Sequence, residues 1–165
     1  MNPAEFLRLI EENKGILYKI AASYCRHAGE REDLIQEMIY QLWRAAGKYD
    51  STQKFSTYMY RIALNVAISF YRQASRSGVR VALNADLHLA EEEVKGPLEE
   101  RVELLQQWVA ALGELDKALM ILYLEERSYR EIAEILGITE TNVGTKLGRL
   151  KERLKKQLIM LNNQL

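Results

Sequence analysis

Apolar residues return every three or four positions along most of this chain, which is the spacing of one face of an α-helix. The first such run consists of Phe6, Leu7, Ile10, Leu17, Ile20, Ala21 and Tyr24. No stretch of useful length alternates apolar and polar residues as a β-strand does, and only two of the 165 residues are proline. The pattern predicts an all-α fold.

Capping signals mark where the first helices begin and end. Asn2 is placed to cap a first helix, with Pro3 in its first turn. A second helix is expected from about Arg31 to Ala46, after a break centred on Gly29. Gly47 then stands where a left-handed C-terminal cap would be.

A third helix is expected from about Lys54 to Ser75, capped by Ser51 or Thr52. Periodicity then fades over residues 77–96, where three glutamates run together and the chain reads as a linker. Pro97 opens a second helical block, with helices expected at Leu98–Leu112, Asp116–Glu125, Tyr129–Leu136 and Glu140–Leu161. The layout is therefore two small helical domains, residues 1–76 and 97–165, joined by a linker at residues 77–96.

Composition limits the kinds of partner, cofactor and cellular location that we expect for this chain. The formal net charge is zero, so the overall charge points to neither nucleic acid nor membrane. Cys25 is the one cysteine, and together with His27 it is too little for a metal site, so we expect a partly buried thiol and no cofactor. No secretion signal or run of about 18 apolar residues is seen, which predicts a cytoplasmic protein without membrane insertion.

The stretch "SYREIAEILGITETNVGTKLGRLKERL" has the spacing of a helix-turn-helix. Ile132, Ala133 and Leu136 would form the inner face of its first helix. Gly137 would make the turn, because glycine adopts a left-handed backbone at little cost, and Thr139 would cap the second helix. An apolar stripe on that second helix is expected from Val143, Leu147, Leu150, Leu154 and Leu158.

The other side of this second helix is polar near its start and basic further on. The residues expected to contact DNA there are Thr141, Asn142, Thr145, Lys146, Arg149 and Arg153. The competing interpretation is a solvated basic helix. Gly144 and Gly148 lie outside the core in this prediction, so they either let the backbone approach DNA or are tolerated weaknesses.

A second informative stretch is "EDLIQEMIYQLW" at residues 32–43. Its inward face is predicted to hold Leu34, Ile35, Met38, Ile39 and Leu42. Its outward face is predicted to hold Asp33, Gln36, Glu37, Tyr40 and Arg44. The acidic and amide side chains are either ordinary surface or a docking site for a basic protein surface.

With these motifs in order, the chain resembles a bacterial RNA polymerase sigma factor of the extracytoplasmic-function (ECF) group. "REDLIQEMIYQLW" resembles the helix that binds the clamp helices of the polymerase β′ subunit. "FSTYMYRIALNVAISFYRQ" resembles the helix for the downstream promoter element, and the helix-turn-helix resembles the reader of the upstream element. The resemblance implies core RNA polymerase and promoter DNA as partners. Because many members are held by an anti-sigma protein, it also implies such a partner.

The resemblance assigns roles to residues of the first block. Those matched to polymerase docking are Asp33, Gln36, Glu37 and Tyr40. Those matched to downstream promoter binding are Lys48, Asp50, Ser51, Thr52 and Lys54 in a loop that would capture a flipped-out base, and Tyr58, Arg61, Asn65 and Arg72 on the next helix. For Tyr58, packing in the core is an equal alternative. Basic residues continue through Arg76 and Arg80 toward the linker.

These observations predict a dissociable sigma factor that directs promoter-specific initiation. No nucleophile–base pair or phosphate loop is recognisable, so it is not expected to be an enzyme. One alternative is a DNA-binding regulator that acts without polymerase. Another is a sigma-like helical protein that does not read promoters.

Overall fold

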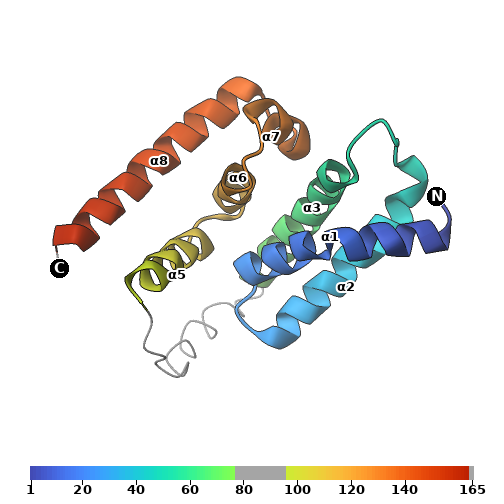
Figure 1. Cartoon of the computed structure of the whole chain (residues 1–165), viewed down its shortest axis with the longest axis horizontal. Helices are drawn as coiled ribbons and strands as arrows, with labels where there is room; N and C mark the ends of the chain where they lie inside the picture. Colours follow the sequence, from blue (N-terminus) through green and yellow to red (C-terminus); the bar gives the residue numbers. More distant parts are fainter. Residues whose placement is uncertain (77–95, 164–165) are drawn as a thin grey trace. The chain divides into compact units, whose positions relative to one another are not determined.

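The computed structural model describes residues 1–76 and 96–163, and all their regular structure is helical. The first block contains α1 (Pro3–Tyr24), α2 (Ala28–Ala45), the short 3-10 helix η1 (Ala46–Lys48) and α3 (Phe55–Arg76). Then follow α5 (Pro97–Ala110), α6 (Glu114–Leu124), α7 (Tyr129–Leu136) and α8 (Glu140–Asn163), as Figure 1 shows. The all-α prediction is confirmed.

Several helix ends lie where local capping chemistry predicts them. Asn2 Oδ1 accepts a hydrogen bond from the backbone N–H of Glu5 at 2.8 Å, and Pro3 is the first residue of α1. Pro97 likewise opens α5. The predicted bounds of Tyr129–Leu136 agree with those of α7.

Two predictions about α2 are wrong. The helix begins at Ala28, three residues before the predicted start, so Gly29 is helical. Gly47 is not a left-handed cap, because positive φ among the described residues occurs only at Glu126 and Gly137. The chain instead tightens into η1, and the N–H of Tyr49 donates to the carbonyl of Ala46 at 3.2 Å.

The predicted cap of α3 is also wrong. The backbone carbonyl of Lys54 accepts from the N–H groups of Thr57 and Tyr58 at 3.1 and 3.3 Å, so Lys54 stands at the start of the helix. Thr52 lies outside it, and its N–H donates to Asp50 Oδ1 at 2.9 Å. The preceding loop therefore uses its polar groups on itself.

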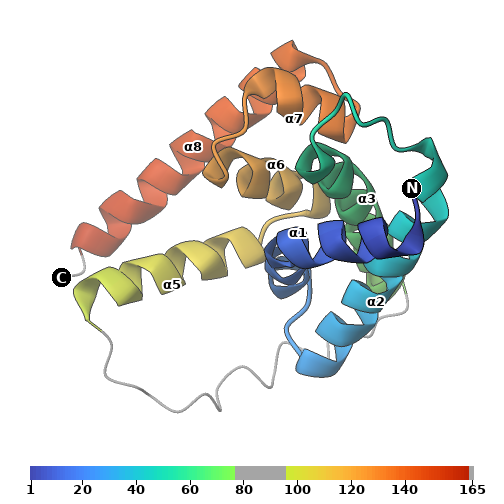
Figure 2. The same ribbon diagram turned by 45° about the vertical axis from the view of Figure 1, so that its right-hand side comes forward.

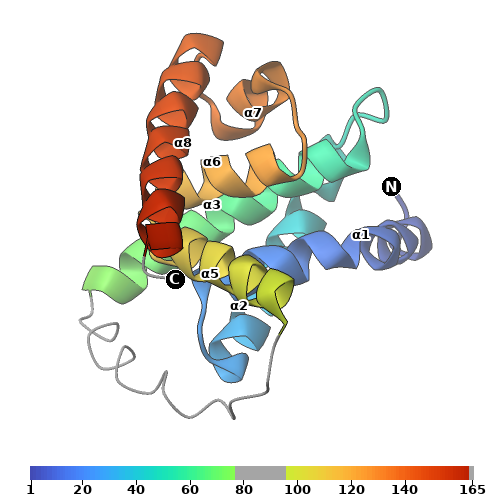
Figure 3. The same ribbon diagram turned by 60° about the vertical axis from the view of Figure 1, so that its left-hand side comes forward.

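By its internal contacts the chain forms two compact units, Met1–Glu114 and Leu115–Leu165. In the first, α1, α2 and α3 contact one another pairwise as a three-helix bundle, and α5 contacts α1 (Figure 3). Its fully buried side chains include Leu17, Ile20, Leu34, Met38, Leu42, Met59 and Leu64. The predicted linker lies outside the described residues apart from Gly96, and the domain limits at residues 76 and 97 stay a prediction.

In the second unit, α7 packs against the N-terminal half of α8 (Figure 2). Val143, Leu147 and Leu150 are buried there, but Leu154 is half-buried and Leu158 is 46% exposed. The predicted stripe therefore leaves the core after Leu150. The reason is length, since the eight residues of α7 span only about 12 Å and cannot cover all 24 residues of α8.

Among the helices of the described ranges, none combines the length and the apolar character needed to cross a lipid bilayer.

Candidate polymerase and nucleic-acid interfaces

The four residues predicted to dock on polymerase lie together on the outer face of α2. Asp33, Gln36, Glu37 and Tyr40 are all exposed. The opposite face buries Leu34, Met38 and Leu42 completely, which fixes the rotation of the helix. Ile35 and Ile39, predicted to face inward, are half-buried at the edges. The face also carries a hydrogen bond between Gln41 Nε2 and Glu37 Oε1 at 2.8 Å.

An apolar groove of about 460 Å³ lies beside this face, between α1 and α2. Its lining residues are Pro3, Phe6, Leu7, Gln36, Ile39, Tyr40 and Trp43. Phe6 is buried and meets Trp43 edge to face at 5.0 Å, whereas Leu7 and Trp43 are exposed. The sequence interpretation counted Leu7 among the apolar face of the first helix, which is wrong, and it did not single out Trp43. Two adjacent apolar pairs in the sequence, Phe6–Leu7 and Leu42–Trp43, could have indicated both exposed residues. Neighbours on a helix point about 100° apart, so when one member of such a pair faces the core the other lies toward the surface.

The predicted base-binding residues lie at the last residue of η1 and in the loop between η1 and α3, which projects from the bundle (Figure 3). Lys48, Asp50, Ser51, Thr52 and Lys54 are all exposed. The backbone N–H of Thr52 and its side chain hold the pKa of the Asp50 carboxyl below its usual value. The loop therefore exposes an ionised carboxylate that Thr52 holds in place, and the hydroxyl of Ser51.

On α3, the residues predicted to line the melted strand divide into two groups. Arg61, Asn65 and Arg72 are exposed on one face, four and seven residues apart. Tyr58 is buried, its Oη donates to the carbonyl of Ala45, and burial raises its pKa. Tyr58 therefore lies in the core, as the packing alternative supposed.

Arg72 has a partner within its own unit. Its Nε donates to Glu114 Oε1 at 2.7 Å, and the Arg72 side chain remains 59% exposed. The backbone carbonyl of Glu114 accepts from Tyr24 Oη at 2.7 Å. Any contact between Arg72 and a DNA phosphate must compete with this carboxylate. Arg76 is exposed, and Arg80 lies outside the described residues.

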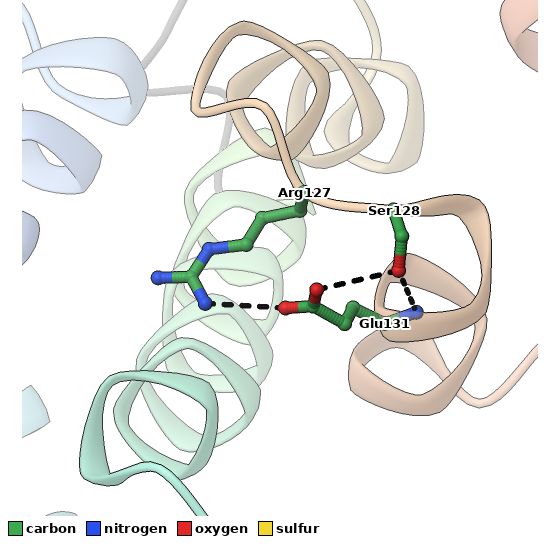
Figure 4. Close-up of polar contacts among 3 residues, drawn as sticks. All are labelled: Arg127, Ser128 and Glu131. Atoms are coloured by element: carbon green, nitrogen blue, oxygen red, sulfur yellow. Dashed lines mark hydrogen bonds and ion pairs between the residues drawn. The ribbon is translucent and has the colours of Figure 1, made fainter.

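The turn before the helix-turn-helix is set by local hydrogen bonds around Ser128 (Figure 4). Ser128 Oγ accepts from the N–H of Glu131 at 3.1 Å and donates to Glu131 Oε1 at 3.3 Å, so Ser128 caps α7. Arg127 donates to Glu131 Oε2 at 3.2 Å. Burial would raise the pKa of Glu131, but Arg127 and Ser128 together hold it below its usual value of 4.5.

Two left-handed residues frame α7. Gly137 ends it with φ of 69°, as predicted, and the N–H of Ile138 reaches back to the carbonyl of Ala133 at 3.2 Å. Glu126 ends α6 with φ of 58°, and the N–H of Arg127 donates to the carbonyl of Leu122 at 3.1 Å. The sequence did not reveal the second turn, because glutamate is not a residue that favours this conformation.

The predicted DNA-reading residues lie on the outer side of α8. Thr141, Asn142, Thr145, Arg149 and Arg153 are exposed, and Lys146 is half-buried. Thr139 caps the helix as predicted, since its Oγ1 accepts from the N–H of Asn142 at 3.1 Å. Arg153 lies 3.9 Å from Asp116 Oδ2, at the limit of an ion pair. Short polar side chains near the helix start and arginines further on are the chemistry of major-groove binding.

Lys151 has a structural role that the sequence did not show. Its Nζ lies 4.4 Å from the centre of the Tyr123 ring and donates to Tyr129 Oη at 3.0 Å, and this hydrogen bond raises the pKa of Lys151. The cation therefore joins α6, α7 and α8.

The space around the two glycines of α8 is open. A methyl group at Gly148 would meet no heavy atom within 4 Å, and one at Gly144 would lie 3.7 Å from the Tyr129 ring, an ordinary contact. Neither has positive φ. Packing in the free protein therefore does not require glycine at either position.

Comparison with known proteins shows the family to which the two helical blocks belong. The family description for sigma-70 region 2 matches residues 9–77, and that for sigma-70 region 4 matches residues 103–154. The ECF RNA polymerase sigma factor SigW of Bacillus subtilis (strain 168) is 29% identical over 167 residues, covering 93% of this chain and 88% of SigW. SigM of the same organism is 28% identical over 145 residues, covering 84% and 86%.

A solved structure shares the fold. The sigma factor RpoE of Bartonella quintana, in complex with the anti-sigma factor NepR, superposes with a TM-score of 0.68 at 18% identity, over 93% of this chain and 96% of RpoE. The region 2 match covers α2 and α3, and the region 4 match covers the helix-turn-helix. The chain belongs to the ECF RNA polymerase sigma factors, which are not enzymes, and it directs promoter-specific initiation by core RNA polymerase.

Proposed function

We propose that this sigma factor divides its task among three surfaces. The outer face of α2 docks on the β′ clamp helices of core polymerase through Asp33, Gln36, Glu37 and Tyr40. The loop at residues 48–54 and the exposed face of α3 bind the melted downstream element. The outer face of α8 reads the upstream element. The observation that carries the proposal is that each helix presents its polar face outward while its opposite face is buried.

Competition for core polymerase tests the docking surface. The double variant Gln36→Ala/Glu37→Ala should unfold within about 0.5 kcal/mol of wild type, because both side chains are exposed. Its affinity for core polymerase should fall about tenfold or more, because the substitutions remove a carboxylate and an amide that would pair with polar groups of the polymerase. Glu11→Ala, which removes an exposed carboxylate from α1, is the matched control and should bind core as wild type does. Equal competition by the double variant and wild type would exclude this docking surface.

The upstream surface has its own test. Arg149 is exposed on α8, so Arg149→Ala should leave the fold intact and weaken binding to the upstream element. Loss of a base contact should cost about 1–3 kcal/mol and relax specificity at one position, whereas loss of a phosphate contact should weaken all sequences alike. If Arg149→Ala leaves the promoter affinity unchanged, Arg149 is not part of the surface that reads the upstream element. Run-off transcription with core polymerase then measures the combined effect of each variant.

We also propose that an anti-sigma protein binds this sigma factor and keeps it from core polymerase. We propose further that the sigma factor acts in the cytoplasm. The support is the fold shared with RpoE, whose structure was solved with the anti-sigma factor NepR. Core polymerase added to a complex purified from the native host should compete with such a protein. Recovery of the chain with polymerase alone, under both inducing and non-inducing growth, would argue against it.

A further inference from the structure

The loop between η1 and α3 is closed by hydrogen bonds that its sequence does not reveal. Tyr49 Oη donates to the backbone carbonyl of Gln53 at 2.9 Å. The N–H of Gln53 donates to the carbonyl of Asp50 at 3.0 Å, and the N–H of Thr52 donates to Asp50 Oδ1 at 2.9 Å. Tyr49 thus spans the loop from its first residue to its far side.

The ring of Tyr49 is itself fixed by two aromatic neighbours. It meets Phe55 edge to face, with ring centres 5.4 Å apart, and Tyr58 at 5.0 Å. Phe55 and Tyr58 are buried, and Tyr58 Oη is held by the carbonyl of Ala45 at the end of α2. The hydroxyl of Tyr49 is therefore presented to the loop from a rigid base.

The tip of the loop is not stabilised by packing against the core. Asp50, Ser51 and Thr52 are exposed, so no burial holds their backbone in one conformation. Fixing a residue costs about 1–2 kcal/mol of conformational entropy, and a loop ordered before binding avoids that cost when a ligand arrives. A brace from a buried aromatic cluster to the far side of the loop supplies this order.

We propose that Tyr49 is a positioning residue for promoter melting, whose hydroxyl holds Asp50, Ser51 and Thr52 in the conformation that receives a flipped-out base. The inference rests on the proposed role of this loop in downstream element binding. Tyr49 acts through the backbone of Gln53 and does not itself need to touch DNA. Phenylalanine at this position would keep the ring packing and lose the brace.

The test uses holoenzyme assembled from core polymerase and the full chain. Its preferred promoter is first selected from a random-sequence duplex library. Binding is then measured on that promoter with the downstream element held open by mismatches, and on versions with each unpaired base replaced in turn by an abasic site. Tyr49→Phe should bind the intact open promoter about 3- to 10-fold more weakly, the effect of one hydrogen bond, while the fold is retained and the melting temperature falls by only a few degrees.

The decisive readout is whether the protein and DNA changes are additive. If Tyr49 acts through base capture, Tyr49→Phe should have no further effect on the promoter that lacks the captured base. An equal loss on intact and abasic promoters, or none on either, would overturn the inference. If no abasic site weakens promoter binding by wild-type holoenzyme, the proposed base-binding role of the loop is wrong, whatever Tyr49→Phe does. Tyr18→Phe, which removes the hydroxyl of an exposed tyrosine on α1, is the matched control. It should change the affinity for neither the intact nor the abasic promoter.

Discussion

Lys151 Nζ donates a hydrogen bond to Tyr129 Oη at 3.0 Å, linking the two helices of the helix-turn-helix across 22 residues of sequence. The same ammonium lies over the Tyr123 ring at 4.4 Å. A residue that looks like one more member of a basic cluster thus links three helices of its unit at their surface. Three predictions concern how this unit is held together, and a fourth concerns the glycines of its second helix.

Lys151→Met should lower the free energy of unfolding by about 1 kcal/mol, because it removes one hydrogen bond and one cation–π contact. Chemical denaturation of the full chain, followed by circular dichroism, measures the change. Lys155→Met on an exposed position of the same helix should change stability little. Adding Tyr129→Phe to Lys151→Met should cost less than Tyr129→Phe alone costs wild type. Full additivity would show that the two side chains do not stabilise each other.

Glu126→Gly should stabilise the protein by up to about 1 kcal/mol. The residue holds φ of 58° at the end of α6, a left-handed conformation that costs a side chain about 1–2 kcal/mol and that glycine adopts freely. Glu152→Gly is the control of opposite sign, because Glu152 is exposed within α8 and glycine weakens a helix interior by about 1 kcal/mol. Equal losses for both variants would mean that Glu126 bears no strain.

Glu131 should make the stability of the helix-turn-helix depend on pH. Its pKa in the folded protein lies below the usual 4.5, so the stability that it contributes is complete above that value. That contribution is lost as the pH falls through the lower folded value. The difference in unfolding free energy between wild type and Glu131→Gln should therefore shrink from about pH 5 to about pH 3. A difference that is constant over this range would show that Arg127 and Ser128 together do not stabilise the ionised carboxylate of Glu131.

Gly144→Ala and Gly148→Ala should each raise stability by up to about 1 kcal/mol, since both positions are helical and have room for a methyl group. Thermal unfolding measures this directly, and a loss at Gly148 would contradict the open space around it. Promoter affinity of the same variants then separates the two explanations of the glycines. A more stable Gly148→Ala that binds DNA more weakly indicates close approach of the backbone. Unchanged or tighter binding by both indicates tolerated weaknesses.

The sequence by itself determined the helices and most of their ends. Asn2 and Thr139 cap helices as predicted, and Gly137 makes the predicted left-handed turn, because these hydrogen bonds join residues at most five positions apart. Amphipathic spacing likewise placed Asp33 and Glu37 outside and Leu34 and Met38 inside. The identity of the family followed from three such segments in order.

Only the tertiary structure decided which equivalent-looking residues serve the core. Tyr58 could equally have stacked on DNA, and it became core because Ala45, at the end of another helix, accepts its hydroxyl. Leu158 continues an apolar stripe in sequence yet is exposed, because α7 is too short to reach it. The partners of Tyr49 and Lys151 were likewise decided by contacts between segments that are separate in the sequence. A periodic pattern fixes the direction in which a side chain points, but packing between separate segments determines what it meets.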